Sequence, residues 1–172
     1  MRSYYNIIDK LHTYLNGNAS INTVTFGDLL EVDLSKQTIF PLAHINIQNV
    51  AFAEHIMNIN INVVVMDLVD EDKDDKQDKA KPHLGLDNKH DIQNTLLTVV
   101  NGIQSAIRRG ELYDDLFHLN TDPTAQLFED KFENKVTGWS MDLSIRTPNN
   151  DMALINRDGT ECHLQSQSQK HI

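Results

Sequence analysis

The segment Ile56–Leu68, IMNININVVVMDL, constrains the fold more than any other part of the chain. In its first half, apolar residues alternate with Asn58, Asn60 and Asn62, a period of two that is typical of a β-strand and not of an amphipathic helix. From Val64 onward the second face becomes apolar as well. The segment therefore predicts a central strand with one apolar face, and another part of the chain must cover the second face from Val64 onward.

Two segments predict amphipathic helices. In the first, apolar side chains recur at helical spacing from Tyr4 to Leu15. The second runs from about Asp91 to Arg109, with an apolar stripe, an aspartate at its start and arginines in its last turn. Gly102 inside the second helix costs about 1 kcal/mol relative to alanine. A close approach to the sheet or to another neighbour would explain this glycine.

Three further segments have the pattern of strands. They are Ile21–Phe26, Thr38–Val50 and Phe132–Arg146. Ala51–His55 then links the second of these to the central strand, which predicts a long hairpin whose Asn, Gln and His side chains share one face. Strands do not alternate with crossover helices. The sequence therefore predicts an α+β fold, with a mainly antiparallel sheet of about four strands and two main helices packed on one face.

The chain length is that of one domain, and two stretches fall outside its predicted core. With 172 residues the chain can bury a single core, which we assign to residues 1–148. Residues 70–90 begin with DEDKDDKQDKAK, have no apolar periodicity and are expected to form an acidic mobile loop. Residues 149–172 turn polar and are expected to form a flexible C-terminal tail. The segment through Asp122 and Pro123 is expected to be irregular.

The charge balance argues against binding to nucleic acid. The chain has 25 acidic and 15 basic residues, for a net charge of −10, whereas affinity for a phosphate backbone comes from Lys and Arg. Cys162 is the only cysteine, which excludes an intrachain disulfide and fits a protein made in a reducing cytoplasm. The N-terminal residues lack the apolar stretch of a signal peptide, and no window approaches the roughly 20 apolar residues that span a bilayer. We expect no membrane association.

Motifs of catalysis and metal binding are missing from the sequence. It has no Gly-rich phosphate loop, no nucleophile elbow and no paired His or Cys zinc motif. Asp70, Asp72 and Asp74 fit the first positions of a calcium loop, but Asp75 and Lys81 replace its glycine and its glutamate. The eight histidines lie on different predicted elements, with no pair at the i, i+4 spacing of a shared metal face. We expect neither an enzyme nor a cofactor.

The second face of the predicted sheet is polar. Its side chains come from the central strand and the last strand, and they are Asn58, Asn60, Asn62, Ser140, Asp142 and Ser144. Two interpretations stay open, a solvated sheet face and a polar interface between subunits. The acidic loop is a second candidate contact surface, through Asp70, Glu71, Asp72, Asp74 and Asp75.

The order of these segments resembles the tail-completion or tail-terminator proteins of tailed bacteriophages. The resemblance covers about residues 4–147 and includes the hairpin FPLAHINIQNVAF and IMNININVVVMDL, the helix NTLLTVVNGIQSAIRRG and the last strand NKVTGWSMDLSI. It implies a non-enzymatic structural protein that is made in the host cytoplasm and resides in the tail or neck of the virion. It also implies a ring, expected to be a hexamer or dodecamer, that contacts other tail, neck or portal-associated proteins.

The acidic composition agrees with such a ring. DNA must pass through it without specific binding, and an acidic chain beside a channel would repel phosphates and let the duplex slide. The acidic insertion and the polar C-terminal end lie outside the resemblance. Alternatives are a tail-hub or neck ring protein of a short-tailed phage, and a soluble acidic adaptor whose polar sheet face or acidic loop binds a basic protein.

Overall fold

The computed structural model of the protein describes residues 2–29, 39–70, 88–109, 112, 117–129, 135–149, 154–155 and 161–162. Its helices are α1 (Arg2–Asn16) and α2 (Lys89–Arg109). Its strands are β1 (Thr23–Phe26), β2 (Leu42–Phe52), β3 (Ile56–Leu68), β4 (His118–Leu119), β5 (Thr124–Glu129), β6 (Val136–Pro148), β7 (Leu154–Ile155) and β8 (Glu161–Cys162).

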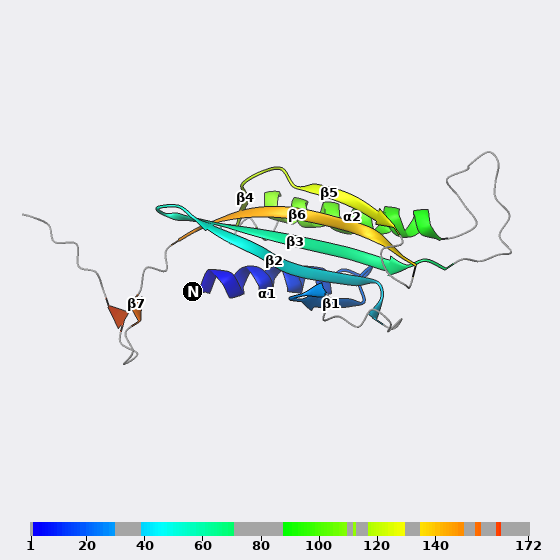
Figure 1. Cartoon of the computed structure of the whole chain (residues 1–172), viewed down its shortest axis with the longest axis horizontal. Helices are drawn as coiled ribbons and strands as arrows, with labels where there is room; N and C mark the ends of the chain where they lie inside the picture. Colours follow the sequence, from blue (N-terminus) through cyan, green and yellow to red (C-terminus); the bar gives the residue numbers. More distant parts are fainter. Residues whose placement is uncertain are drawn as a thin grey trace, which may run out of the picture.

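Six of the strands form one sheet in the order β1-β2-β3-β6-β4, with β5 also paired to β6 (Figure 1). β1 runs parallel to β2, and the other pairs of this sheet are antiparallel. Both helices pack on the same face, as predicted (Figure 1). The α+β class and the mainly antiparallel sheet are confirmed, with the predicted central strand at the bounds expected from its alternation.

The sheet has two more strands than the four predicted, namely β4 and β5. β4 has only two residues, too few for a sequence pattern. β5 begins directly after Pro123, where an irregular segment was expected, and it is a six-residue strand that pairs only with β6. Most of its side chains are exposed and only Phe128 is buried. Its sequence therefore carries little of the apolar alternation by which buried strands are recognised.

The main core lies between the helices and one face of the sheet. Along β3, every second residue from Met57 to Val65 is at most 1% exposed. The helices contribute Ile7, Leu11, Leu15, Ile92, Leu96, Val99, Val100, Ile103, Ala106 and Ile107 to the same cluster. A β-carbon placed on Gly102 would lie 2.7 Å from the Tyr14 hydroxyl, so the predicted close approach is that of α1 to α2.

The second face of the sheet is covered at one end only. Val64 and Met66 are buried there with Phe40, Leu42, Phe128 and Val136. This small cluster confirms that another part of the chain covers the second face from Val64 onward. Towards the β2–β3 hairpin the same face of β3 carries Asn58, Asn60 and Asn62 instead, and neither helix covers it (Figure 1).

Several predicted boundaries move in the structure. β2 begins at Leu42, directly after Pro41, and continues to Phe52. α2 begins at Lys89 and not at Asp91, because the Asn88 carbonyl already accepts a hydrogen bond from the Ile92 N–H at 3.0 Å. The last two residues of the predicted 70–90 loop are thus helical, while residues 71–87 lie outside the described part of the chain. Within the predicted C-terminal tail, β7 and β8 form a separate antiparallel pair.

Candidate functional site

The structure brings the six predicted sheet residues together on the open face. In the register of β3 with β6, Asn60 lies opposite Ser144 and Asn62 lies opposite Asp142. The Asn62 Nδ2 donates hydrogen bonds to the Asp142 Oδ1 at 2.7 Å and to the Ser140 Oγ at 2.9 Å. Asn58, at the hairpin end, lies opposite Arg146. We call this surface the open polar face.

Strands β2 and β5 widen the open polar face on both sides. Asn46 lies opposite Asn62, and a bulge after Ile47 leaves Gln48 without a partner in β3. Asn49 therefore takes the place expected for Gln48, and its Oδ1 accepts a hydrogen bond from the Asn60 Nδ2 at 2.6 Å. On the other side, Thr124 and Gln126 of β5 lie opposite Asp142 and Ser140. The sequence prediction missed these two residues because it missed β5.

Amides dominate the chemistry of the open polar face. The carboxylate of Asp142 and the guanidinium of Arg146 are the charges on its β3 and β6 rows, and Arg146 donates a hydrogen bond to the Asn120 Oδ1. The Asn58 Oδ1 is buried and, alone among described side-chain N and O atoms of this kind, has no hydrogen-bond partner. An unsatisfied buried acceptor costs about 1–3 kcal/mol, so Asn58 does not stabilise the fold through this atom.

His44 marks the border between the open polar face and the apolar end. Its side chain is 1% exposed, and its Nε2 donates to the Gly27 carbonyl at 3.0 Å, while its Nδ1 lies 2.8 Å from the Thr25 hydroxyl. Burial lowers the pKa of His44, although the Gly27 carbonyl and the charge of Asp28 act in the opposite direction. The neutral imidazole thus satisfies both of its nitrogens and has no free coordination position for a metal.

Asp70, the described residue of the predicted acidic surface, is not part of the open polar face. Asp70 follows the end of β3 that is remote from the hairpin, and its backbone N–H donates to the Asn88 Oδ1 at 2.8 Å. Glu71, Asp72, Asp74 and Asp75 lie outside the described residues.

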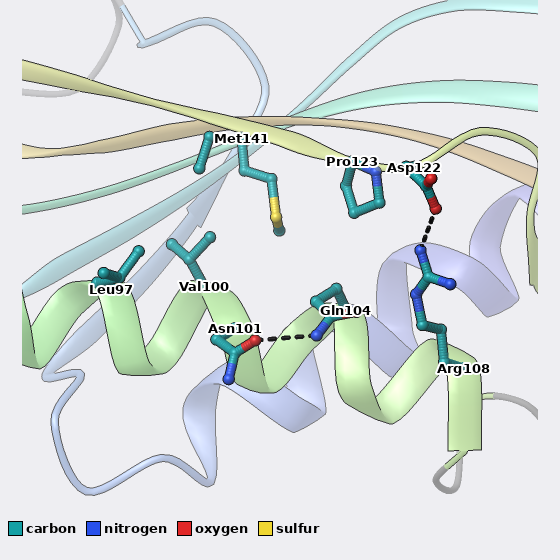
Figure 2. A pocket seen from close by; sticks show the side chains of 9 residues that line it. Leu97, Val100, Asn101, Gln104, Arg108, Asp122, Pro123 and Met141 are labelled. Carbon is teal, nitrogen blue, oxygen red and sulfur yellow. Dashed lines mark hydrogen bonds and ion pairs between the residues drawn. The ribbon is translucent and has the colours of Figure 1, made fainter.

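A groove on the helix side is a surface that the sequence did not predict (Figure 2). It lies between α2 and β5, has a volume of about 270 Å³, and is lined by Leu97, Val100, Asn101, Gln104, Arg108, Asp122, Pro123, Ala125 and Met141. Figure 2 shows Val100 and Met141 pointing into the space between the helix and the sheet. Arg108 and Asp122 form an ion pair at one end. The sequence signal for this edge is weak, because apolar and polar residues alternate only from Thr124 to Leu127 before Phe128 breaks the pattern.

At the end remote from Arg108, hydrogen bonds and an ion pair hold α2 to β5 and β6. The Gln93 side chain donates hydrogen bonds to Glu129 and to Thr137, each at 3.0 Å, and the Trp139 indole N–H donates to the Gln93 carbonyl at 2.8 Å. Lys89 pairs with Glu129 at 2.8 Å, and bonds from Lys89 and Gln93 lower the pKa of the Glu129 carboxyl. The C-terminal half of α2 has no such network with β5.

Nothing in the described part of the chain assembles a metal centre from three or more His, Cys, Asp or Glu side chains. The described helices also include none that is long and apolar enough to cross a membrane.

Models of known protein families do not match this sequence, and a search of curated proteins finds no match. The open polar face and the groove are therefore interpreted from their geometry alone.

Proposed function

We propose that this protein is a ring-forming structural component of a tailed-phage virion, of the tail terminator, tail completion or head–tail connector type. The proposed role involves neither catalysis nor a cofactor. The observation that carries it is the open polar face, a broad sheet surface that neither helix covers. Apart from the short strands β4 and β5 between α2 and β6, the order α1, β1, β2, β3, α2, β6 also agrees with the layout on which the resemblance to tail-terminator proteins rests.

The composition of the open polar face favours a contact surface over a merely solvated one. The central row of this face, on β3, carries Asn58, Asn60 and Asn62 and no charged residue, while the adjacent β6 row carries Asp142 and Arg146 between serines. Interfaces are depleted of charged residues in their centre, because removing a charge from water costs much more than removing an amide. Amides can also donate and accept hydrogen bonds, so they can pair with the polar surface of another subunit.

The net charge supports a ring around DNA and not a DNA-binding protein. A net charge of −10 on each copy multiplies in a hexamer or dodecamer and repels phosphates in the channel. The proposed partners are therefore further copies of the chain and neighbouring tail, neck or portal-associated proteins. A cyclic ring requires that two different surfaces of each copy meet.

Sedimentation velocity of the purified protein over a wide concentration range, with negative-stain electron microscopy of the same samples, tests this proposal. We expect closed rings of six or twelve copies with a central channel, and a population that grows with concentration. A protein that stays monomeric at every concentration would contradict the ring and favour the adaptor alternative.

A further inference from the structure

On the β2 side, the sheet ends in a strand that is only partly paired. β1 runs along β2 from Leu42 to Ile45, and no described strand pairs with the outer side of β2 from Asn46 to Phe52 (Figure 1). We call this stretch the β2 edge. It contains neither a proline nor a charged residue. Such residues normally protect exposed edges, because the unpaired backbone of an edge readily pairs with another strand. The β2 edge is therefore open to strand addition.

The backbone of the β2 edge offers hydrogen-bonding groups to a partner. The Ala53 N–H donates to the Ile56 carbonyl inside the hairpin at 2.8 Å, so Ala53 faces β3. Backbone groups alternate in direction along an antiparallel strand, and the register with β3 is regular from Asn49 to Phe52. The N–H and C=O groups of Val50 and Phe52 therefore point away from β3.

The opposite border of the sheet has a second edge of this kind. β5 pairs with β6 on one side, and no described strand pairs with its other side. We call Thr124–Glu129 the β5 edge. Its one charged residue, Glu129, is already in an ion pair with Lys89. With six residues, the β5 edge is about as long as the β2 edge.

Both edges have the same two-sided pattern of side chains. On the open polar face they carry polar residues, with Asn49 on β2 and Thr124 and Gln126 on β5. On the helix side both expose a large apolar side chain, since Phe52 is 65% exposed and Leu127 is 43% exposed. A sheet that continues from one copy into the next keeps its helix side on the same side. Apolar residues would then lie beside apolar residues, and polar beside polar.

Strand direction determines how the two edges can meet. β2 runs antiparallel to β3, β3 to β6, and β6 to β5, so β5 runs opposite to β2. A second copy that continues the sheet in the same orientation therefore places its β5 antiparallel to β2. The two edges are different surfaces of the chain, and a contact between different surfaces closes into a ring when the rotation allows it.

We propose that the β2 edge of one copy pairs with the β5 edge of the next copy as antiparallel strands, so that the open polar faces of adjacent copies join. The inference rests on the proposed function and describes its subunit contact. The contact includes the open polar face, because β2 and β5 are its two borders and the Asn60 side chain donates to Asn49 at the β2 border at 2.6 Å. In strand addition, main-chain hydrogen bonds give the affinity and side chains give the specificity.

Disulfide cross-linking tests this geometry. Within one copy, three strand spacings of about 4.8 Å place β2 about 14 Å from β5, too far for a disulfide. In a Cys162→Ser background, Asn49→Cys or Ala51→Cys is combined with Thr124→Cys or Gln126→Cys. These four positions are exposed and lie on the open polar face. After mild oxidation, at least one of the four double variants should give a ladder that ends at the ring size.

Two controls accompany the cross-linking. A mixture of the corresponding single variants should stop at dimers, because each copy then carries one thiol. Asn49→Cys combined with His12→Cys, on the exposed side of α1, should give no ladder. If none of the four double variants cross-links better than this control, the proposal is overturned.

A proline at the β2 edge is the second test. Val50→Pro removes an N–H that points outward, and edge strands tolerate proline, so we expect the fold to persist. Val50→Thr keeps the N–H and the shape of the side chain and is the matched control. In sedimentation velocity, Val50→Pro should weaken self-association by about tenfold or more, and Val50→Thr should change it much less.

Leu127→Lys tests the β5 edge independently, because a charged side chain on an edge opposes pairing. It should also weaken self-association by about tenfold or more, and it decides the outcome if thermal melting shows that Val50→Pro does not fold. Intact rings in a folded edge variant would overturn the edge contact and leave the proposed function standing. A parent protein without rings would overturn both.

Discussion

The two faces of the β2–β3–β6 sheet differ in what they do for the molecule. On the helix side, Ile59, Ile61 and Val63 of β3 are fully buried. On the other side, the intervening Asn60 and Asn62 are partly exposed, and they donate hydrogen bonds to Asn49 of β2 and to Asp142 of β6, respectively. Alternate residues of one strand thus lie on two different surfaces. The covered face supplies the stability of the fold, and the open polar face is the surface that we propose for contacts with other subunits.

The largest expected effect comes from adjacent positions on the two faces. Ile61→Ala should lower the free energy of unfolding by about 2–5 kcal/mol, because it leaves a cavity in the core under the helices. Asn60→Ala, the next residue on the opposite face, is the matched control and should cost about 1 kcal/mol or less. Chemical denaturation of both variants gives the comparison. Equal losses of unfolding free energy in the two variants would mean that the covered face does not contribute more stability than the open polar face.

Removing a polar side chain that is buried between α2 and the sheet should lower the free energy of unfolding more than removing one on the partly exposed surface of α2. Gln93→Ala should cost about 1–3 kcal/mol, because it leaves the buried Thr137 hydroxyl without its donor and frees the start of α2 from β5. Gln104→Ala is the control on the same helix, since Gln104 bonds only to its near neighbours Asn101 and Ser105. Thermal melting with equilibrium urea unfolding measures both, and a Gln104 variant as unstable as the Gln93 variant would contradict the assignment.

We expect the stability of the fold to depend on pH because of the buried His44. Burial lowers its pKa in the folded protein below the ordinary value near 6.5, so the unfolded chain binds a proton more readily than the folded one. Stability should therefore be complete above pH 6.5 and should decrease as the pH falls below it. We expect a loss of a few degrees in Tm between pH 7.5 and 5.5. His44→Gln should have a smaller pH slope over this interval, and an unchanged slope would exclude His44 as its source.

The smallest effect is expected at Asn58 on the open polar face. Asn58→Val removes a buried oxygen that has no hydrogen-bond partner and adds a β-branched side chain that suits a strand. Tm should stay the same or rise slightly. A clear loss in differential scanning calorimetry would show that the Asn58 amide makes a stabilising contact.

The sequence alone predicted the helices and strands whose buried residues recur in a long, regular pattern. β3, β6 and α2 were predicted because their apolar residues recur with a period of two or near 3.6, and burial enforces those periods. β5 was not predicted because only Phe128 along it is buried. The bulge at Gln48 depends on pairing with β3, which no local pattern records.

The same reasons explain how much of the candidate site was predicted. The rows on β3 and β6 follow from the alternation, so Asn60, Asn62 and Ser144 were placed correctly on one face. The groove forms where β5 lies beside α2 in the folded chain, and no sequence pattern connects these two segments. Its lining residues were therefore not predicted. Of the predicted acidic surface, only Asp70 falls within the described residues.

Asn60→Arg tests most directly whether the open polar face is where subunits meet. The substitution puts a long, charged side chain in the centre of this face, with His12→Arg on the exposed side of α1 as the matched control. Sedimentation velocity and thermal melting are measured on both variants and on the parent. We predict that Asn60→Arg keeps a Tm within a few degrees of the parent but loses the rings that the parent and the His12→Arg control form. Rings of unchanged size and stability in Asn60→Arg would contradict the account, because the open polar face would then be only a solvated surface.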